Sequence, residues 1–360
     1  MKQEIVDKNF IDNFRSHLQK KKPKNCLIIT SQGNLERGRL EEFKSILYLH
    51  NIQVEIFLVN DYPDFKIISE ALNSKQKKCY EFVISIGGGS PIDVGKIYSS
   101  CISNKRNIEN IEDIELEKSK LIFNIAIPTT AGTGAESTQF STIWSKELVS
   151  KYSYEDKSLL PEVVYLIPEF LLSLPKLTTL STSLDTICHS LDSILNKYKN
   201  NKSSLLSTDS LMIMNNYVPK ILEDPSNIEY RKNSLKASNL AGKAINITRT
   251  SLNHSISYPL TNLYGLEHGF ACAFSVLGII ENFRELIESI EEASFIFQTE
   301  NLIRSLNLNQ NYKSKLNNID IHLLIEQIVG NARLSNFCFP IEETDLFNIL
   351  EYSYKNYLLK

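Results

Sequence analysis

Short apolar runs alternate with amphipathic stretches along the first half of the chain. The runs are rich in β-branched residues and are bounded by turn-forming residues, which is typical of buried strands. The stretches 35–49 and 65–72 carry apolar residues at helical spacing. Alternating strands and helices predict a parallel sheet with helices on both faces. The predicted strands are 26–30, 54–59, 82–86 and 121–127.

The pattern changes near residue 172, and from there apolar residues recur at helical spacing without a strand-like run. Prolines are expected to break or end these helices. A chain of 360 residues is also too long for one ordinary core. We therefore expect an α/β domain over 1–172 and an all-α domain over 173–360. The prolines concerned are Pro219, Pro225, Pro259 and Pro340.

Composition and charge narrow the class of protein. With 42% hydrophobic and 22% charged residues, the chain resembles ordinary globular proteins. A net charge of −3 gives no general attraction to nucleic acid or to an anionic membrane. No window reaches the ~18 apolar residues of a membrane helix, and the first residues lack a secretory pattern. The six cysteines are scattered without a Cys-x-x-Cys pair, so we expect a cytoplasmic protein.

A glycine turn follows the predicted strand 82–86. Three glycines let the backbone bend sharply and approach a ligand, and Ser90 is expected to cap the next helix, with Asp93 completing a capping box. Exposed amides at a helix start favour an anion such as a pyrophosphate. A tight strand–helix turn without a ligand explains the same residues. The turn consists of Gly87, Gly88, Gly89 and Ser90.

A second loop, rich in hydroxyl groups and glycines, follows the predicted strand 121–127. Such a loop suits a dinucleotide approached from the other side, although an ordinary surface turn has the same composition. Its hydroxyl side chains are Thr129, Thr130 and Thr133.

One aspartate and three histidines form a candidate metal set. Asp185 and His189 are four residues apart on a predicted helix, so both project from one face. His254 and His268 lie near apolar helical stretches. Together they suit a tetrahedral site with three nitrogen donors and one oxygen donor. Taken singly, an Asp–His pair on a helix surface and buried core histidines are the ordinary explanations.

Taken in order, these motifs resemble the iron-containing (group III) alcohol dehydrogenase family. The motifs are Gly87-Gly-Gly-Ser90 with Asp93 and Lys96, Pro128-Thr-Thr-Ala-Gly-Thr-Gly134 with Glu136, Asp185-x-x-x-His189, His254-x-x-x-Tyr258-Pro-Leu260, and His268-Gly269.

The resemblance implies a Rossmann-like N-terminal domain, a helical C-terminal domain and a cleft between them, as in the dehydroquinate synthase-like fold. It implies that Fe²⁺, or alternatively Zn²⁺, is bound by Asp185, His189, His254 and His268. It also implies NAD(P)H as the second cofactor, reduction of a small-molecule aldehyde, and a homodimer. The residues it assigns to the dinucleotide are Ser31, Gly87, Gly88, Gly89, Ser90, Asp93, Thr129, Thr130 and Thr133.

A narrower resemblance, over 142–161 and 242–261, is to the phosphonoacetaldehyde reductase branch. That branch reduces phosphonoacetaldehyde to 2-hydroxyethylphosphonate, a step of phosphonate biosynthesis. Arg249, five residues before His254, is then expected to hold the anionic group of the substrate. Three alternatives stay open: a general short-chain alcohol dehydrogenase or lactaldehyde reductase, a non-catalytic nucleotide-binding relic, and a dehydroquinate-synthase-like cyclase.

Several positions depart from the family pattern. Tyr258 stands where a proton-relaying histidine is common, so we expect Tyr258 or water to deliver the proton. Ser31 occupies the position of an aspartate that repels a 2′-phosphate, so we expect NADPH to be usable beside NADH. The other departures are Ala135 for Ser, Asp192 for Glu and Ile167 for Asp.

Overall fold

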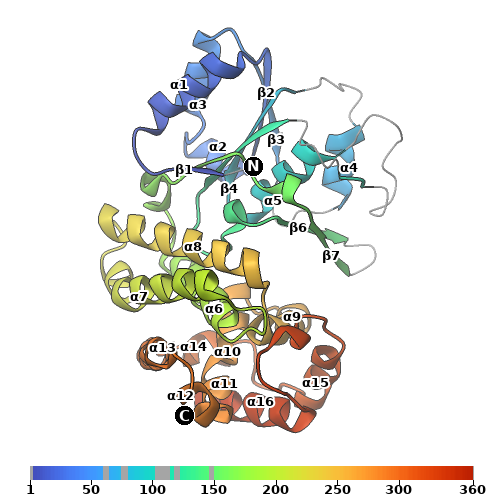
Figure 1. Ribbon diagram of the computed structural model, residues 1–360, viewed down its shortest axis with the longest axis vertical. Coiled ribbons are helices and arrows are strands. Elements are labelled where there is room, and N and C mark those ends of the chain that lie inside the picture. Colours follow the sequence, from blue (N-terminus) through green and yellow to red (C-terminus); the bar gives the residue numbers. More distant parts are fainter. Residues whose placement is uncertain are drawn as a thin grey trace. The chain divides into compact units, whose positions relative to one another are not determined.

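The computed structural model describes residues 3–59, 65–73, 80–101, 114–116, 122–145 and 150–359. The chain divides into two compact units (Figure 1). The first comprises Met1–Thr130 and Ala135–Leu171, and the second comprises Ala131–Gly134 and Leu172–Lys360. The sequence predicted a single domain boundary after residue 172, whereas in the structure the segment Ala131–Gly134 also belongs to the helical unit.

The first unit is built on a parallel six-stranded sheet with the order β1-β8-β5-β4-β2-β3, accompanied by an antiparallel pair, β6-β7. The four predicted strands correspond to β2–β5, although residue 121 lies outside the described residues. The other four strands were not predicted: β1 and β8 have only three residues, too few for a pattern, and the longer β6 and β7 were not recognised either. The strands are β1 Glu4–Val6, β2 Asn25–Thr30, β3 Gln53–Leu58, β4 Phe82–Gly87, β5 Phe123–Pro128, β6 Phe140–Ser145, β7 Ser150–Glu155 and β8 Val163–Tyr165.

Helices cover both faces of this sheet, because its central strands are apolar on both sides. Cys26 and Ile28 of β2 pack in the core under α1 and α3, whereas Leu27 and Ile29 pack in the core under α4 and α5 (Figure 1). These alternate contacts confirm the predicted α/β class. The helices of this unit are α1 Phe10–Lys21, α2 Gln32–Glu36, α3 Glu41–Leu49, α4 Phe65–Asn73 and α5 Gly89–Ser100.

The helix predicted over 35–49 is wrong at its start. The structure instead has the short α2 followed by α3, and Gly38 between them has a φ of +67°. That left-handed conformation ends a helix at little cost only where glycine provides it. Apolar periodicity continued across Gly38 and hid the break.

The second unit is helical, as expected, around one large apolar core. Two prolines do not break helices as predicted: Pro219 lies inside α7 and Pro259 inside α9. Pro259 is itself buried, so packing offsets the lost backbone hydrogen bond, a cost of ~3 kcal/mol. The helices are α6 Lys176–Ile194, α7 Asn201–Glu223, α8 Ile228–Thr248, α9 Leu252–Tyr264, α10 His268–Phe274, α11 Val276–Asn282, α12 Arg284–Glu288, α13 Ala293–Ser305, α14 Asn309–Lys313, α15 Ile321–Val329 and α16 Glu343–Leu358.

Two sequence expectations concern membranes and disulfides. Within the described residues, no helix combines the length and apolar character needed to cross a bilayer. The described cysteines, which exclude Cys79, are free thiols.

Candidate functional site

Three helices of the second unit bring the predicted metal residues together. α6 presents Asp185 and His189 on one face, α9 carries His254 in its first turn, and α10 begins at His268. The Nε2 atoms of His189, His254 and His268 lie 3.7, 3.5 and 3.7 Å from one oxygen, Asp185 Oδ1. The structure therefore gathers all four side chains around one point.

This spacing fits a shared metal ion better than direct hydrogen bonding. Distances of 3.5 to 3.7 Å exceed a good hydrogen bond, whereas metal–ligand bonds of about 2.1 Å place tetrahedral donors about 3.4 Å apart. Asp185 and His254 are each only 3% exposed. Among the described residues, Asp185 Oδ1 and His254 Nε2 are buried without a hydrogen-bond partner. Buried polar atoms without a partner destabilise the folded protein, and a divalent ion bound between these side chains would supply the missing partner. The residues present therefore fit a divalent ion.

Two of the four side chains, His189 and Asp185, already have the protonation state that a metal ligand needs. Burial lowers the pKa of His189 to about 4, so the imidazole is neutral near pH 7 with a lone pair for a metal. Burial alone would raise the pKa of Asp185, but His189, His268 and His254 lower it well below its usual value. Asp185 is therefore an ionised carboxylate beside the neutral imidazole of His189, whereas the pKa values of His254 and His268 are raised, so a metal displaces protons from these two rings.

Asp192, two turns along α6 from Asp185, fixes the orientation of His254. Its Oδ2 lies 2.8 Å from Nδ1 of His254, which directs Nε2 toward Asp185. The same carboxylate accepts the backbone N–H groups of Ser251, Asn253 and His254 at the start of α9. It thereby caps that helix and places a negative charge at its positive end.

A close helix contact sets the position of His268. A Cβ added to Gly269 would lie 1.8 Å from the carbonyl oxygen of Ser181, so α10 touches the backbone of α6. Glycine is required for that approach. The contact brings His268 to Asp185 and also brings in Cys272, which sequence reasoning missed as a donor. Its spacing of four residues from His268 was the available signal.

The predicted dinucleotide residues gather partly at one edge of the sheet in the first unit. β2 and β4 are neighbours, and β4 also pairs with β5. Ser31, the turn 87–90 and the pair Thr129–Thr130 follow their carboxyl ends. Successive strands are added on one side of β2 with β3 and on its other side from β4 onward, so the strand order reverses between β2 and β4. Open α/β sheets bind ligands at such a point.

The start of α5 differs from the prediction. Gly88, not Ser90, is the N-cap, and no side chain caps this helix, so the predicted capping box is absent. Instead the carboxylate of Asp93 accepts the N–H of Thr142 at 3.0 Å and contacts Nζ of Lys96 at 3.3 Å. Tertiary contacts to β6 thus outcompete local capping. Without a side chain over them, the first amides of α5 suit an anion.

Close packing constrains Gly88 of this turn and Gly95 of α5. A Cβ on Gly88 would lie 3.2 Å from Oγ1 of Thr130, and one on Gly95 would lie 1.8 Å from Oγ of Ser85. Gly95 therefore lets α5 lie directly on β4. Thr133 lies in the segment Ala131–Gly134, which belongs to the second unit. In that segment Gly134 (φ +58°) touches Gly242 of α8.

Sequence comparison decides the family. Residues 3–168 match the iron-containing alcohol dehydrogenases, and residues 179–323 match the C-terminal domain of the same enzymes. The chain belongs to the iron-containing alcohol dehydrogenase family. It is therefore an oxidoreductase with the fold of that family, as the resemblance implied.

Individual proteins similar to this alcohol dehydrogenase support the same family assignment. The NAD-dependent methanol dehydrogenase of Bacillus methanolicus is 26% identical over 298 residues, 80% of this chain and 78% of that protein. The phosphonoacetaldehyde reductase of Streptomyces viridochromogenes is 27% identical over 192 residues, 53% of this chain and 47% of that protein. The solved iron-containing alcohol dehydrogenase of Thermotoga maritima is 25% identical, with a TM-score of 0.80 and 98% of each chain covered.

Two further predicted residues flank the candidate metal ligands of this alcohol dehydrogenase in the sequence. Tyr258 is half-buried on α9, four residues after His254, and the guanidinium of Arg333 lies 5.0 Å from its ring centroid. Arg249 is exposed directly after α8, with φ 65° and ψ 174°. Arg333 was not predicted, because about 80 residues separate it from the motif around His254.

Proposed function

We propose that this alcohol dehydrogenase reduces a small aldehyde to its primary alcohol, with NADH or NADPH as the hydride donor. The observation that carries the proposal is the convergence of three histidine Nε2 atoms on the buried Oδ1 of Asp185. A non-catalytic protein that only binds a nucleotide has no need for such a set, because buried polar atoms without a partner destabilise the fold unless something binds them.

The chemistry divides between bound groups and the chain. Asp185, His189, His254 and His268 would hold a divalent ion, with Fe²⁺ and Zn²⁺ as the candidates, which would supply Lewis acidity toward the aldehyde oxygen; a bound nicotinamide would supply the hydride. Asp185 contributes the negative charge that retains the ion, and Asp192 holds His254 in the ligating orientation.

Proton delivery falls to a residue of α9 or to water. Tyr258 lies one helical turn beyond His254, and its phenol is a donor of the required kind. We assign it, or a water molecule, to protonate the product oxygen.

The dinucleotide is assigned to the carboxyl edge of the parallel sheet. Its pyrophosphate suits the uncapped start of α5 beside Gly88, Gly89 and Ser90. Thr129 and Thr130 follow the neighbouring strand, and Ser31 follows β2 toward the ribose. Thr133 is assigned to the dinucleotide on the family resemblance alone. Asp93 acts here by positioning, since its carboxylate already contacts Thr142 and Lys96.

Phosphonoacetaldehyde is the proposed substrate, and a short uncharged aldehyde is the second candidate. The Streptomyces relative supports the first, and the methanol dehydrogenase relative supports the second. Arg249 is assigned to the anionic group, and Arg333 beside Tyr258 is a second cation for that role. As in the family, we expect a homodimer.

A turnover panel separates these candidates. Purified enzyme is assayed with phosphonoacetaldehyde and with propanal, each with NADH and NADPH. Charge-assisted bonds contribute ~1.5–3 kcal/mol, so Arg249→Ala should lower kcat/KM for the phosphonate roughly ten- to a hundredfold and leave propanal unchanged. Arg333→Ala run in parallel shows which cation holds the anion. Equal activity on both aldehydes excludes the phosphonate assignment, and no activity on either excludes aldehyde reduction.

A further inference from the structure

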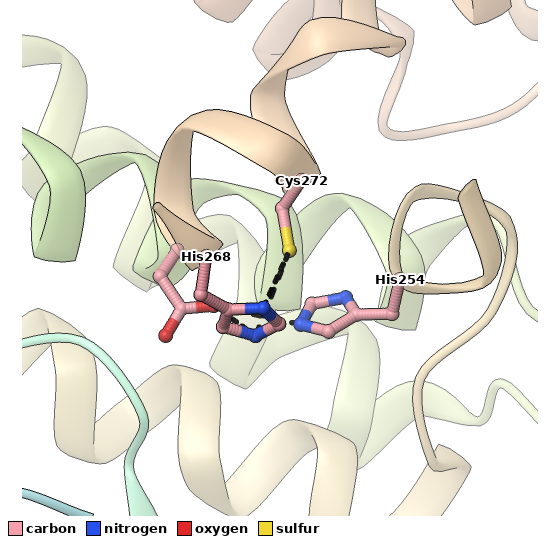
Figure 2. A group of neighbouring side chains, drawn as sticks. His254, His268 and Cys272 are labelled. Carbon is pink, nitrogen blue, oxygen red and sulfur yellow. Dashed lines mark hydrogen bonds and ion pairs between the residues drawn. The ribbon is translucent and has the colours of Figure 1, made fainter. Parts of the chain in front are cut away.

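A thiol stands beside the proposed metal ligands. Cys272 lies one turn after His268 on α10, and its sulfur points at the His268 ring, beside which the His254 ring lies (Figure 2). Its Sγ lies 3.8 Å from Nε2 and 4.0 Å from Nδ1 of His268. The side chain is fully buried.

We propose that Cys272 is a sulfur donor of this metal centre, through which the enzyme binds thiophilic divalent ions. The donor set is then Asp185, His254, His268 and Cys272, with one oxygen, two nitrogens and one sulfur. The inference rests on the metal centre proposed above, in which Cys272 offers an alternative fourth donor to His189.

The geometry suits this role. The four donor atoms of this set all lie within 4.8 Å of one another. Bonds of about 2.3 Å to sulfur and about 2.1 Å to nitrogen give a tetrahedral edge of about 3.6 Å, close to the distance from Cys272 to His268. Asp185 and His254 contribute buried atoms without hydrogen-bond partners to the same space. Cys272 therefore shares a space with atoms that lack a partner.

Three of these donors also belong to the set that contains His189. His189 and Cys272 thus compete for the remaining position, and a thiophilic ion takes the sulfur of Cys272 there. On binding, the thiol releases its proton to solvent and the sulfur donates an electron pair to the ion. No oxidant or reductant takes part.

The ordinary role of a buried cysteine is that of a small apolar residue, and Cys188 illustrates it. Cys188 is equally buried and precedes His189 directly on α6. Among the described residues it is nevertheless not part of the group whose donor atoms converge. Burial near the ligands is therefore not sufficient, and only Cys272 of these two directs its sulfur to the site.

A sulfur donor predicts metal preference. Thiolates favour Zn²⁺ and the softer Cd²⁺, whereas Mn²⁺ and Mg²⁺ prefer oxygen. Replacing Cys272 should therefore weaken Cd²⁺ binding much more than Mn²⁺ binding. We expect at least the loss caused by removing an outer-shell partner, about tenfold or more.

Cobalt substitution tests the bond directly. The full chain is stripped of metal, loaded with Co²⁺ and examined for the near-ultraviolet thiolate-to-cobalt charge-transfer band. We expect the band in the wild type and in Cys338→Ser, a half-buried cysteine of the same unit. We expect it to vanish in both Cys272→Ser and Cys272→Ala, while the visible cobalt bands persist.

The outcomes separate the two proposals. Cobalt bands in the visible range without a charge-transfer band in the wild type overturn the role of Cys272 and leave the metal centre intact. A charge-transfer band that survives Cys272→Ala also overturns it. Absence of any bound cobalt overturns both proposals. Circular dichroism of each variant verifies its fold, and two substitutions guard against one that fails to fold.

Discussion

Replacing Asp192 by asparagine should weaken metal binding although Asp192 is not a metal ligand. Its Oδ2 accepts the N–H of Ser251 at 2.8 Å and contacts Nδ1 of His254 at 2.8 Å. Its Oδ1 accepts the N–H of Asn253 at 3.0 Å and the side-chain amide of Asn253 at 2.9 Å. In either orientation, the asparagine NH₂ would face an N–H donor.

The orientation that keeps Oδ1 as an acceptor turns the NH₂ toward His254. The imidazole then accepts at Nδ1 and carries its proton on Nε2, where the metal lone pair is needed. The other orientation sets the NH₂ against Asn253. Loss of an outer-shell partner typically costs 10–100-fold in metal affinity, or about 1.4–2.7 kcal/mol. A buried unsatisfied donor should also lower the free energy of unfolding of the metal-free protein by about 1–3 kcal/mol.

The assay is Zn²⁺ competition against a chromophoric chelator, combined with thermal unfolding of the metal-free protein. Asp192→Glu keeps the carboxylate and should retain most of the affinity. Asp12→Asn is the control: it removes the same charge at a side chain that is 80% exposed, and it should leave the zinc affinity unchanged. Wild-type zinc affinity in a folded Asp192→Asn protein would refute the orienting role.

Four further predictions follow from the same structure. His268→Ala should remove bound metal and activity together, measured by elemental analysis and turnover; full turnover of metal-free protein would contradict it. NADPH should support turnover beside NADH, and Ser31→Asp should lower the NADPH rate selectively by charge repulsion; a wild type restricted to NADH would show this to be wrong. Arg249→Gly should raise the melting temperature by relieving strain of about 1 kcal/mol, because φ 65° with ψ 174° suits glycine, and an unchanged temperature would argue against strain. Burial alone would lower the pKa of His254, but Cys272, Asp185 and Asp192 raise it well above its usual value. A metal must therefore displace a proton from His254, so metal affinity should fall as the pH drops below that pKa. Zinc titration at several pH values measures this dependence, and a pH-independent affinity would contradict it.

Apolar patterning by itself determined the class of each half of the chain. The four runs that became β2–β5 are long enough to show a pattern, and the motifs along the chain identified the family. Spacing also placed Asp185 and His189 on one helix face, because helical periodicity is local. Elements of three residues, the break at Gly38 and the buried Pro259 escaped this reasoning, since backbone conformation and packing decide them.

Only the tertiary structure decided how the local pieces meet. The contact of Gly269 with Ser181 sets α10 on α6 and thereby brings His268 and Cys272 to Asp185. Contacts between helices likewise give Asp192 its bonds to the start of α9, and tertiary contacts draw Asp93 to β6 instead of a capping box. Sequence spacing reports neighbours within one helix, whereas these groups meet across helices and strands. Their convergence depends on packing distances that no local pattern encodes.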